Sequence, residues 1–357
     1  MSDSQEAGKR MIPKLSICIA TFNRGKYIGE TLDSILSQIE PGVELLVVDG
    51  ASTDDTPGVM ARYLARHPAI RYFREQINSG VDRDYDKAVG YATGEYCWLM
   101  SDDDILKPGA VQYILSAIDG RSDLIVLNSE IWNADFSERL LDRRLRTVTD
   151  IEYAEKDRER FFVGTANHLS FIGCVVISRR FWLSRDRASF YGSLFIHVGV
   201  IFQYPAIKNA KVIAEPLVAI RDGNATWAAR NFEVWAVKWP ELIWSFPDFS
   251  DAAKRAVCPL EQWRRFKFLF YQRAMGSYSL AEFHKFLSRR ANGLAWVKAY
   301  AVAAFPGKAA NLIVVFYYLL LKRKSRLELF DVLCSRNASA ASRLFARTLG
   351  LSAPIRK

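Results

Sequence analysis

The feature that most constrains the fold is a regular alternation of short apolar runs with amphipathic stretches between residues 15 and 128. The runs are four to six residues long and lie at 15–20, 44–49, 70–73, 95–100 and 123–128. Unbroken apolar runs of this length are typical of parallel strands that are buried on both faces. The stretches between them carry apolar residues at helical spacing. The alternation predicts an α/β fold with a doubly wound, mostly parallel, Rossmann-like sheet.

Polar residues gather directly after three of these predicted strands. They are Ala20, Thr21, Asn23 and Arg24 after the first strand, Asp49 and Ser52 after the second, and Asp102, Asp103 and Asp104 after the fourth. Ligands of doubly wound sheets bind at the carboxyl ends of the strands. We therefore expect these side chains to form a ligand site at one edge of the sheet.

The first two clusters allow two interpretations. Small and hydroxyl side chains at a strand end let a flat base and a ribose approach the backbone, and Arg24 could reach a diphosphate. Asp49 is placed to hydrogen-bond a base edge or a ribose hydroxyl. The alternative is that these residues cap the following helices. Both can hold together, with Asp49 binding a ligand and Ser52 to Asp54 capping a helix.

Three adjacent carboxylates, Asp102, Asp103 and Asp104, follow the strongly apolar run that ends at Met100. Such carboxylates repel one another and destabilise the fold unless a cation is near. A divalent cation with oxygen ligands, bridging to substrate phosphates, would remove that cost. A helix N-terminus carrying acidic residues is the alternative. The cluster predicts a site for Mn²⁺ or Mg²⁺.

Together, the clusters have the order and spacing of a known family. The segments PKLSICIATFNR, ELLVVDGASTDDT and NSGVDRDYDKAVGYATGEYCWLMSDDDIL resemble those of the inverting family-two glycosyltransferases, which use nucleotide-sugars and have the GT-A fold. The resemblance covers residues 13–130 and extends more loosely to about residue 227. It implies metal-dependent transfer of a hexosyl or deoxyhexosyl group with inversion.

The resemblance also implies roles for individual residues. It assigns the metal to Asp103, and Asp102 shares this role because the first acid of the family's D-x-D element is Ser101 here. Asp104, beside them, is expected to take part in catalysis. The residues expected to bind the nucleotide-sugar are Ala20, Thr21, Asn23, Arg24, Asp49, Ser52, Gly80, Arg83 and Asp102.

The expected catalytic base departs from the family's pattern. Family members usually carry an acid pair, often Glu-Asp, where this chain has Ile196-His197. This S-x-F-x-H arrangement resembles that of O-antigen transferases of the abequosyltransferase type. These enzymes also carry a later R-x-G-N-x-(S/T)-W element, which residues 221–227 fit. A neutral imidazole can accept a hydroxyl proton near pH 7. We predict His197 as the base, with a packed structural histidine as the alternative.

The charge of the chain is unevenly distributed. Residues 255–357 contain 19 Lys and Arg against 4 Asp and Glu, whereas the remainder contains 30 and 35. A basic region of this kind calls for a polyanionic partner, either nucleic acid or anionic lipid. No nucleic-acid-binding motif accompanies the charge, so we expect no nucleic acid.

Two apolar runs within this basic region, 294–305 and 309–321, are each too short to span a bilayer. Lys322 to Lys324 follow them directly. We expect an interfacial hairpin near residues 294–324 on an anionic membrane surface, with a buried core hairpin as the alternative.

The sequence predicts three parts: a flexible N-terminus at 1–12, a GT-A domain at 13–230, and a helical, basic, membrane-associating region at 231–357. Five scattered cysteines without a CxxC pair indicate a reducing compartment. No apolar stretch precedes the first strand, so no secretory signal is visible. We expect a peripheral or monotopic protein on the cytoplasmic face of the inner membrane.

The expected reaction is sugar transfer from a nucleotide-sugar donor to a polyprenyl-diphosphate-linked saccharide, in the synthesis of bacterial O-antigen or exopolysaccharide. The alternative is a non-catalytic sugar-nucleotide-binding or scaffold protein of a polysaccharide assembly complex, because the family's base carboxylate is missing.

Overall fold

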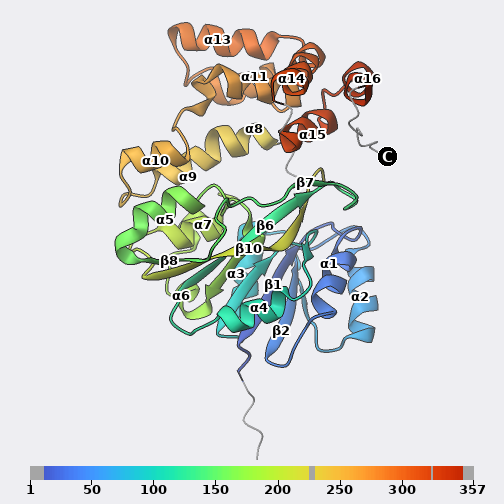
Figure 1. The fold of residues 1–357 in the computed structure, drawn as a ribbon, viewed down its shortest axis with the longest axis vertical. Coiled ribbons are helices and arrows are strands. Elements are labelled where there is room, and N and C mark those ends of the chain that lie inside the picture. Colours follow the sequence, from blue (N-terminus) through green and yellow to red (C-terminus); the bar gives the residue numbers. More distant parts are fainter. Residues whose placement is uncertain (1–11, 225–229, 323–324, 349–357) are drawn as a thin grey trace, which may run out of the picture. The chain divides into compact units, whose positions relative to one another are not determined.

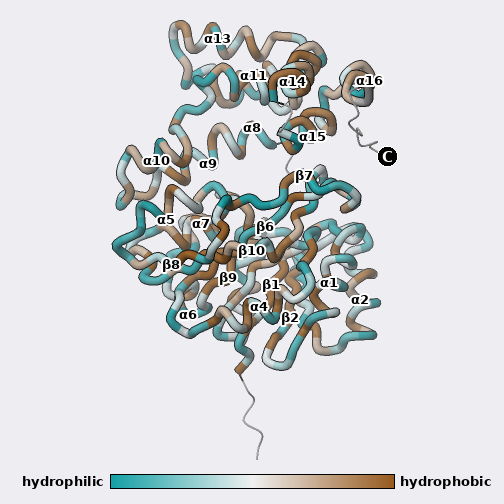
Figure 2. The backbone as a smooth tube through the Cα atoms, in the orientation of Figure 1, coloured by the Kyte–Doolittle hydropathy of each residue, from teal (hydrophilic) through white to brown (hydrophobic). Residues whose placement is uncertain are grey.

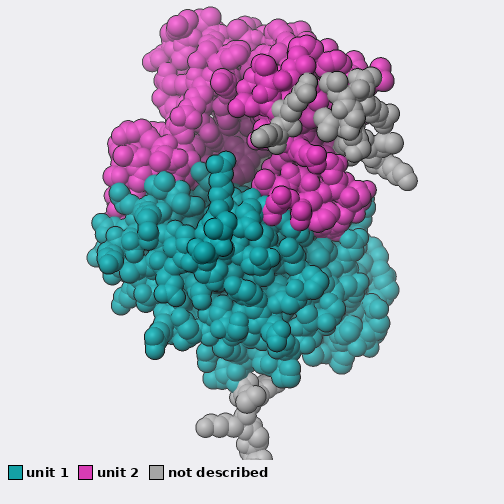
Figure 3. Space-filling view, viewed as in Figure 1, with its two compact units in different colours: residues 1–130, 143–220 teal, residues 131–142, 221–357 magenta. Residues whose placement is uncertain are grey.

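The computed structural model describes residues 12–224, 230–322 and 325–348. The chain divides into two compact units, one made of residues 1–130 and 143–220 and the other of residues 131–142 and 221–357 (Figure 3). The predicted domain boundaries at residues 12 and 230 stay predictions. Nearly all of the predicted flexible N-terminus lies outside the described residues.

The first unit is built around a sheet with helices between its strands (Figure 1). The sheet has ten strands, and all but β7 belong wholly or mainly to the first unit. The strands are β1 (Leu15–Thr21), β2 (Val43–Asp49), β3 (Arg71–Arg74), β4 (Tyr96–Met100), β5 (Ile105–Leu106), β6 (Leu124–Trp132), β7 (Arg139–Leu141), β8 (Ile151–Ala154), β9 (Val175–Ser178) and β10 (Asn209–Arg221). All five apolar runs that were predicted to be strands are strands.

The strand order is β3-β2-β1-β4-β9-β6-β10-β5, with β7 on β6 and β8 on β10. Strands β3, β2, β1 and β4 pair in parallel, as the alternation predicted. Beyond β4, strand β9 lies between β4 and β6 and pairs antiparallel with both. The α/β fold class is confirmed, with a parallel half that carries the predicted strand-end residues.

The helices of the first unit are α1 (Ile28–Leu36), α2 (Thr56–Arg66), α3 (Val81–Tyr91), α4 (Ala110–Ala117), α5 (Arg158–Thr165), α6 (Arg179–Leu183) and α7 (Ile196–Phe202). Helix α1 buries Ile28, Leu32 and Ile35, which is the stripe expected from their spacing. Every residue of β1 and β4 is buried, and the tube around the β1 label is largely brown in Figure 2. Burial of both sheet faces explains why their sequences lack polar alternation.

The second unit is helical apart from β7 and the strand ends beside it. Its helices are α8 (Asn231–Glu233), η5 (Val234–Lys238), α9 (Trp239–Trp244), α10 (Asp251–Val257), η6 (Gln262–Arg264), α11 (Phe266–Met275), α12 (Leu280–Glu282), η7 (Phe283–Leu287), α13 (Gly293–Ala304), α14 (Gly307–Leu321), α15 (Arg326–Cys334) and α16 (Ala340–Thr348). Two apolar clusters hold them, one centred on Tyr278 and Phe283 and the other on Val315 and Val332. The predicted helical C-terminal region is confirmed.

Helices α13 and α14 correspond to the two short apolar runs. Within the described residues, neither helix alone has the length and apolar composition to cross a bilayer, whereas the pair passes that test together with a bend of 96° between its members. One side of α14 packs inward through Ala310, Val314, Val315 and Leu319. Its other side leaves large apolar residues exposed.

Candidate functional site

The ends of β1, β2 and β4 bring the three predicted clusters to one edge of the sheet. Thr21 and Asp49, the last residues of β1 and β2, are partners in the parallel register. The N–H group of Gly50 donates to the carbonyl of Thr21 at 2.9 Å. Strand β4 pairs in parallel with the other side of β1 and ends at Met100. The acidic cluster therefore begins at the same edge as the other two.

The first two clusters are hydrogen-bonded to each other. The N–H of Asn23 donates to Ser52 Oγ at 2.9 Å, and Asn23 Oδ1 accepts the N–H of Thr53 at 2.7 Å. Asn23 has a φ of 55°, in the left-handed region that asparagine tolerates better than most residues. Helix α1 receives no side-chain hydrogen bond at its N-cap, Tyr27. Asn23 thus shapes the strand-end loops instead of capping α1.

Asp49 is fully buried, and both of its carboxylate oxygens have protein partners. Oδ1 accepts the N–H of Ser52 at 2.8 Å, and Oδ2 accepts the hydroxyl of Tyr72 at 2.6 Å. Burial, reinforced by the hydrogen bond and charge of Asp49, raises the pKa of Tyr72. Tyr72 therefore stays a protonated donor that orients the carboxylate. Each carboxylate oxygen can accept a second hydrogen bond. Because Asp49 is 0% exposed, a ligand donor can reach it only if the groups that cover it move.

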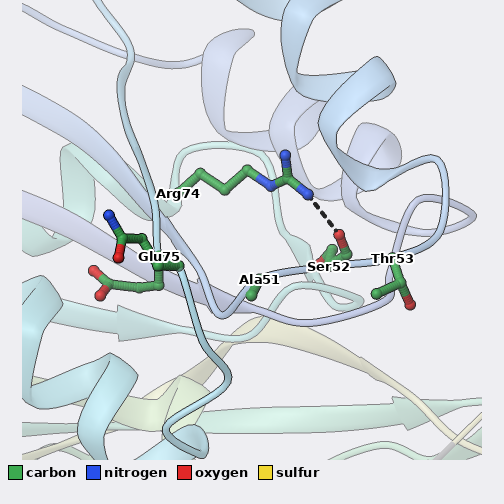
Figure 4. Close-up of a pocket in the computed structure, with 6 residues that line it drawn as sticks. Ala51, Ser52, Thr53, Arg74 and Glu75 are labelled. Atoms are coloured by element: carbon green, nitrogen blue, oxygen red, sulfur yellow. Dashed lines mark hydrogen bonds between the residues drawn. The ribbon is translucent and has the colours of Figure 1, made fainter.

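A cavity of about 550 Å³ opens beside this loop. Its lining residues are Ala51, Ser52, Thr53, Arg74, Glu75 and Gln76. Figure 4 shows Arg74 extended across it toward Ser52, whose carbonyl accepts Nη2 at 2.9 Å. The hollow is largely open to solvent, so it can contact one face of a ligand but does not enclose it. Sequence reasoning missed Arg74 and Glu75, although they follow an apolar run as the predicted clusters do.

Asp84 is a second residue that sequence reasoning missed. It is buried on the first turn of α3, where Oδ1 accepts the hydroxyl of Ser79 at 3.0 Å and lies 3.8 Å from Lys87 Nζ. Burial raises its pKa. A Cβ atom on Gly50 would stand 2.5 Å from Asp84 Oδ2, so only glycine allows this approach. The signal in the sequence was Gly50 directly after a strand-end acid.

The acidic cluster has a protein cation beside it. Arg24 Nη2 lies 3.0 Å from Asp103 Oδ2, and Arg24 Nε lies 3.5 Å from Asp102 Oδ1. Burial and then the charge of Asp103 raise the pKa of Asp102 to about 7, while Arg24 and the hydroxyl of Thr21 act in the opposite direction. Arg24 therefore offsets the repulsion that the sequence predicted for this cluster.

Asp104 faces a different set of groups. Its carboxylate accepts the hydroxyl of Ser101, its side chain is buried, and its carbonyl accepts the hydroxyl of Thr31 at 2.8 Å. These bonds tie the end of β4 to α1. Among the described residues, no three His, Cys, Asp or Glu side chains converge on a common point that could hold a metal. A cation at Asp102 and Asp103 would need further oxygen ligands from elsewhere.

The start of α3 holds the segment that precedes α7. The Asp82 carboxylate accepts backbone N–H groups from Gly192, Leu194 and Ile196 at 2.8 to 3.1 Å. Arg83 lies over the ring of Tyr191, with 4.2 Å from its guanidinium carbon to the ring centroid. Asp86 on the same helix accepts the hydroxyl of Tyr191, accepts the indole N–H of Trp182 and pairs with Arg187. Gly80, with a φ of 89°, begins this helix.

His197 lies on α7 with 2% of its surface exposed. Its Nε2 stands 2.6 Å from the carbonyl of Leu169, so Nε2 carries the proton that is donated. Its Nδ1 is buried and has no hydrogen-bond partner among the described residues. Burial lowers its pKa to about 4, so the ring is neutral at pH 7. The geometry is that of a packed histidine with one uncommitted lone pair.

The R-x-G-N-x-(S/T)-W element belongs mostly to the second unit. Arg221 Nη1 donates to the carbonyl of Ala134 at 2.6 Å, and Gly223 has a φ of 91°. Asp222 hydrogen-bonds to Asp331, and burial raises the pKa of both carboxyl groups. The last three residues of the element, at 225–227, lie outside the described residues.

Solved structures with the same architecture belong to glycosyltransferases. TarS of S. aureus in complex with UDP has a TM-score of 0.55 and 17% identity, over 88% of this chain and 89% of that one. The mannosyltransferase PcManGT from Pyrobaculum calidifontis, in complex with GDP-Man and Mn²⁺, has a TM-score of 0.51 and 17% identity, over 90% and 86%. The fold is therefore that of the GT-A glycosyltransferases, as the sequence predicted.

A family model matches part of the sequence of the first unit. Residues 16–186 match Glycosyl transferase family 2, and the chain carries a sugar-transferase domain of that family. Abequosyltransferase RfbV of Salmonella typhimurium is 26% identical over 260 residues, covering 68% of this chain and 78% of that protein. Chondroitin synthase of Escherichia coli is 33% identical over 120 residues, which are 34% of this chain and only 17% of the synthase. The predicted resemblance to O-antigen and polysaccharide enzymes is confirmed.

Proposed function

We propose that this chain transfers a sugar from a nucleotide diphosphate-sugar to a lipid-linked saccharide, with inversion and with a divalent metal. The observation that carries the proposal is the shared sheet edge, where the Asp49 loop with its cavity follows β2 and the Asp102–Asp103 pair follows β4, the two parallel neighbours of β1. One part can take a nucleoside and the other a metal-bound diphosphate. The similarity to abequosyltransferase RfbV supports surface polysaccharide as the product.

The nucleoside would lie in the loops that follow β1 and β2. Ala20 and Thr21 are the last two residues of β1, and the hydrogen bond from the N–H of Asn23 to Ser52 Oγ joins the loops that follow β1 and β2. Asp49, oriented by Tyr72, would accept a donor group of the base or ribose once the groups that bury its carboxylate move aside. Arg83 and Gly80 stand at the start of α3, where an N-terminus favours anionic groups. TarS with UDP and PcManGT with GDP-Man support a nucleotide in this fold.

The residues at the end of β4 fit a divalent cation. Asp102 and Asp103 offer hard oxygen ligands, and their side chains are already gathered around one cationic side chain. Mg²⁺ and related ions bind through one or two carboxylates together with substrate phosphates. When bound, the metal neutralises charge on the departing diphosphate. The Mn²⁺ in the PcManGT complex supports this assignment.

The reaction is a single displacement. The acceptor oxygen bonds to the anomeric carbon, the bond from that carbon to the diphosphate oxygen breaks, and the acceptor proton passes to a base. His197 is the proposed base, and its Nδ1 is the atom that can accept the proton because Nε2 already donates to Leu169. Its burial means that the segment before α7 must open for an acceptor to reach it. Asp104 holds the end of β4 through Ser101.

The membrane assignment rests on the second unit. Exposed residues recur along α14 at helical spacing, and they are Leu312, Ile313, Phe316, Tyr317, Leu320 and Leu321. We call this set the α14 stripe. Leu294, Val297 and Tyr300 on α13 are exposed as well. Lys308 lies in the first turn of α14, and Lys322 directly follows its last residue. An apolar stripe bordered by basic residues fits an anionic membrane surface, and we propose the cytoplasmic face of the inner membrane.

The test of the proposed function is donor binding by Asp103→Ala. Thermal shift with UDP, GDP and CDP, with and without Mn²⁺, should show a Mn²⁺-dependent stabilisation that Asp103→Ala removes. Asp55→Ala is the matched control, because Asp55 is an exposed acid in the neighbouring loop that pairs with Arg62. Unchanged Mn²⁺-dependent binding in Asp103→Ala would overturn the metal assignment. Loss of both Mn²⁺-dependent binding and sugar transfer in Asp103→Ala, but not in Asp55→Ala, supports the metal assignment.

A further inference from the structure

Arg24 occupies the place where the proposed metal would bind. Its guanidinium spans both carboxylates, with Nη2 3.0 Å from Asp103 and Nε 3.5 Å from Asp102. The three side chains are 11 to 13% exposed, so solvent screens this group only weakly. A divalent cation and a guanidinium bound to the same two carboxylates would repel each other. Metal binding therefore requires Arg24 to move.

The backbone at Arg24 is fixed while its side chain is long. The N–H of Arg24 donates to Thr56 Oγ1 at 2.9 Å, and the N–H of Gly25 donates to Asp54 Oδ2 at 3.0 Å. These bonds anchor the β1 loop to the start of α2. The side chain can change rotamer around this anchor without any movement of the sheet. The guanidinium carbon of Arg24 also lies 5.7 Å from the ring centroid of Tyr27.

A diphosphate gives Arg24 a new partner. Guanidinium groups bind phosphate oxygens through two parallel hydrogen bonds, which are stronger than bonds between neutral groups. The donor's diphosphate would lie against the metal and hence beside Asp102 and Asp103. Arg24 can therefore release the carboxylates to the metal and bind the phosphate that arrives with it.

We propose that Arg24 is a resident counter-ion that exchanges partners, from Asp102 and Asp103 in the free protein to the donor's diphosphate in the loaded site. This inference rests on the proposed metal-dependent donor site. It makes metal and nucleotide binding cooperative, because the metal alone must displace Arg24 with no compensating phosphate. By linkage, each ligand raises the affinity for the other by the same factor. Free metal without donor then binds weakly.

The experiment measures Mn²⁺ binding directly, by the electron paramagnetic resonance signal of free Mn²⁺, with and without UDP or GDP. Without nucleotide, Arg24→Gln should bind Mn²⁺ about tenfold more tightly than the wild type, since a competing charge-assisted pair is gone. The factor by which nucleotide raises Mn²⁺ affinity should fall in that variant. Arg62→Gln, which removes an exposed arginine from α2, should match the wild type in both measurements.

Thermal stability gives a second readout that needs no nucleotide. Arg24→Gln removes the Arg24 cation from Asp102 and Asp103, so its melting temperature should fall, and Mn²⁺ should restore it more than in the wild type. Equal Mn²⁺ affinity in Arg24→Gln and the wild type, with nucleotide coupling intact, would overturn the inference alone. No Mn²⁺ binding by either protein, even with nucleotide, would overturn the proposed metal site and the inference with it.

Discussion

The carboxylate of Asp82 accepts the N–H of Leu194 at 2.9 Å, across 112 residues of sequence. Leu194 has a φ of 72°, a conformation that a side-chain-bearing residue adopts at an energetic cost. The same carboxylate binds the N–H groups of Gly192 and Ile196. One side chain on α3 thus holds the whole turn that leads to His197, and it compensates the backbone strain there.

Asp82→Asn should detach this turn. The amide group replaces an acceptor oxygen with a donor that faces backbone N–H groups, and hydrogen bonds to a charged acceptor contribute about 1.5 to 3 kcal/mol each. We expect the free energy of unfolding to fall by about 2 to 4 kcal/mol, measured by urea denaturation. Asp186→Asn is the control, because Asp186 caps Ser189 in the same segment but is exposed. An Asp82→Asn midpoint equal to the wild type would show that the turn is held by other contacts.

The two buried histidines predict the acid side of the stability profile. Burial lowers the pKa of His197 to about 4 and that of His168 to about 3, against an ordinary value of about 6.5. Between these values the unfolded chain binds protons that the native chain does not, so stability falls as the pH drops below about 6.5. Urea denaturation at pH 7 and pH 5 should show the loss. The double variant His168→Gln, His197→Gln should lose less stability over the same interval, and an equal loss would contradict the assignment.

The same pKa value makes a kinetic prediction for the base. If His197 accepts the acceptor proton, the acid limb of kcat/KM against pH should have its midpoint near pH 4 instead of near pH 6.5. His197→Ala should lower kcat by about 10² to 10⁴ while Mn²⁺-dependent nucleotide binding persists. Turnover near the wild-type level in that variant would move the base to another residue, with Asp186 and Asp222 the next to be changed.

Local patterns predicted the parallel half of this fold because its determinants are local. A strand that is buried on both faces is built mainly from apolar residues, such as Ile17 in β1 and Trp98 in β4. The carboxyl ends of neighbouring parallel strands lie at the same edge of the sheet. The positions of the clusters after Thr21, Asp49 and Met100 follow from that geometry. The insertion of β9 between β4 and β6 did not follow, because strand order depends on long-range pairing that no local pattern records.

The sequence could not identify the partners of the site residues, because these contacts also depend on long-range packing. Three adjacent acids signalled a cation, but nothing local identified Arg24, 78 residues before Asp102, as that cation. His197 was predicted as a base from its place in a motif, whereas its burial comes from the packing of α7. Tyr72 orients Asp49 from the next strand in the sheet, which only the register shows.

Gly50→Ala should disturb the proposed donor site through Asp84. The new Cβ would stand 2.5 Å from Asp84 Oδ2, so the carboxylate or the loop must shift. We expect a stability loss of about 1 to 3 kcal/mol and weaker nucleotide binding in thermal shift. Gly90→Ala on α3 is the matched control, because nothing lies within 4 Å of its added Cβ. Alanine there should stabilise the helix by up to about 1 kcal/mol.

The Asp222–Asp331 pair predicts that the free energy of unfolding falls as the pH rises above about 4. The two carboxyl groups hydrogen-bond to each other, and burial raises the pKa of both above the ordinary value of about 4. Above pH 4 the native chain therefore holds a proton that the unfolded chain releases, and stability falls as the pH rises. Asp331→Asn keeps a neutral donor for Asp222 and should raise the melting temperature at pH 8 more than at pH 4.5. Asp251→Asn, at an exposed acid on α10, should show no such pH-dependent gain.

The α14 stripe predicts membrane binding by the full chain. Phe316 and Leu320 are 50% and 43% exposed, so burying the rest of each side chain in a membrane should contribute about 1 kcal/mol. A glutamate at either position would also be repelled by an anionic leaflet by about 1 kcal/mol. The double variant Phe316→Glu, Leu320→Glu should therefore bind anionic vesicles at least about a hundredfold more weakly in co-sedimentation. Leu260→Glu changes an exposed leucine outside the stripe and should bind as the wild type does.

High salt should weaken membrane binding by the wild type, because salt screens the attraction between the lysines at the two ends of α14, Lys308 and Lys322, and the anionic lipids. If the stripe variant and the wild type sediment equally with vesicles, the α14 stripe does not bind the membrane. The structural support for a lipid-linked acceptor is then lost as well.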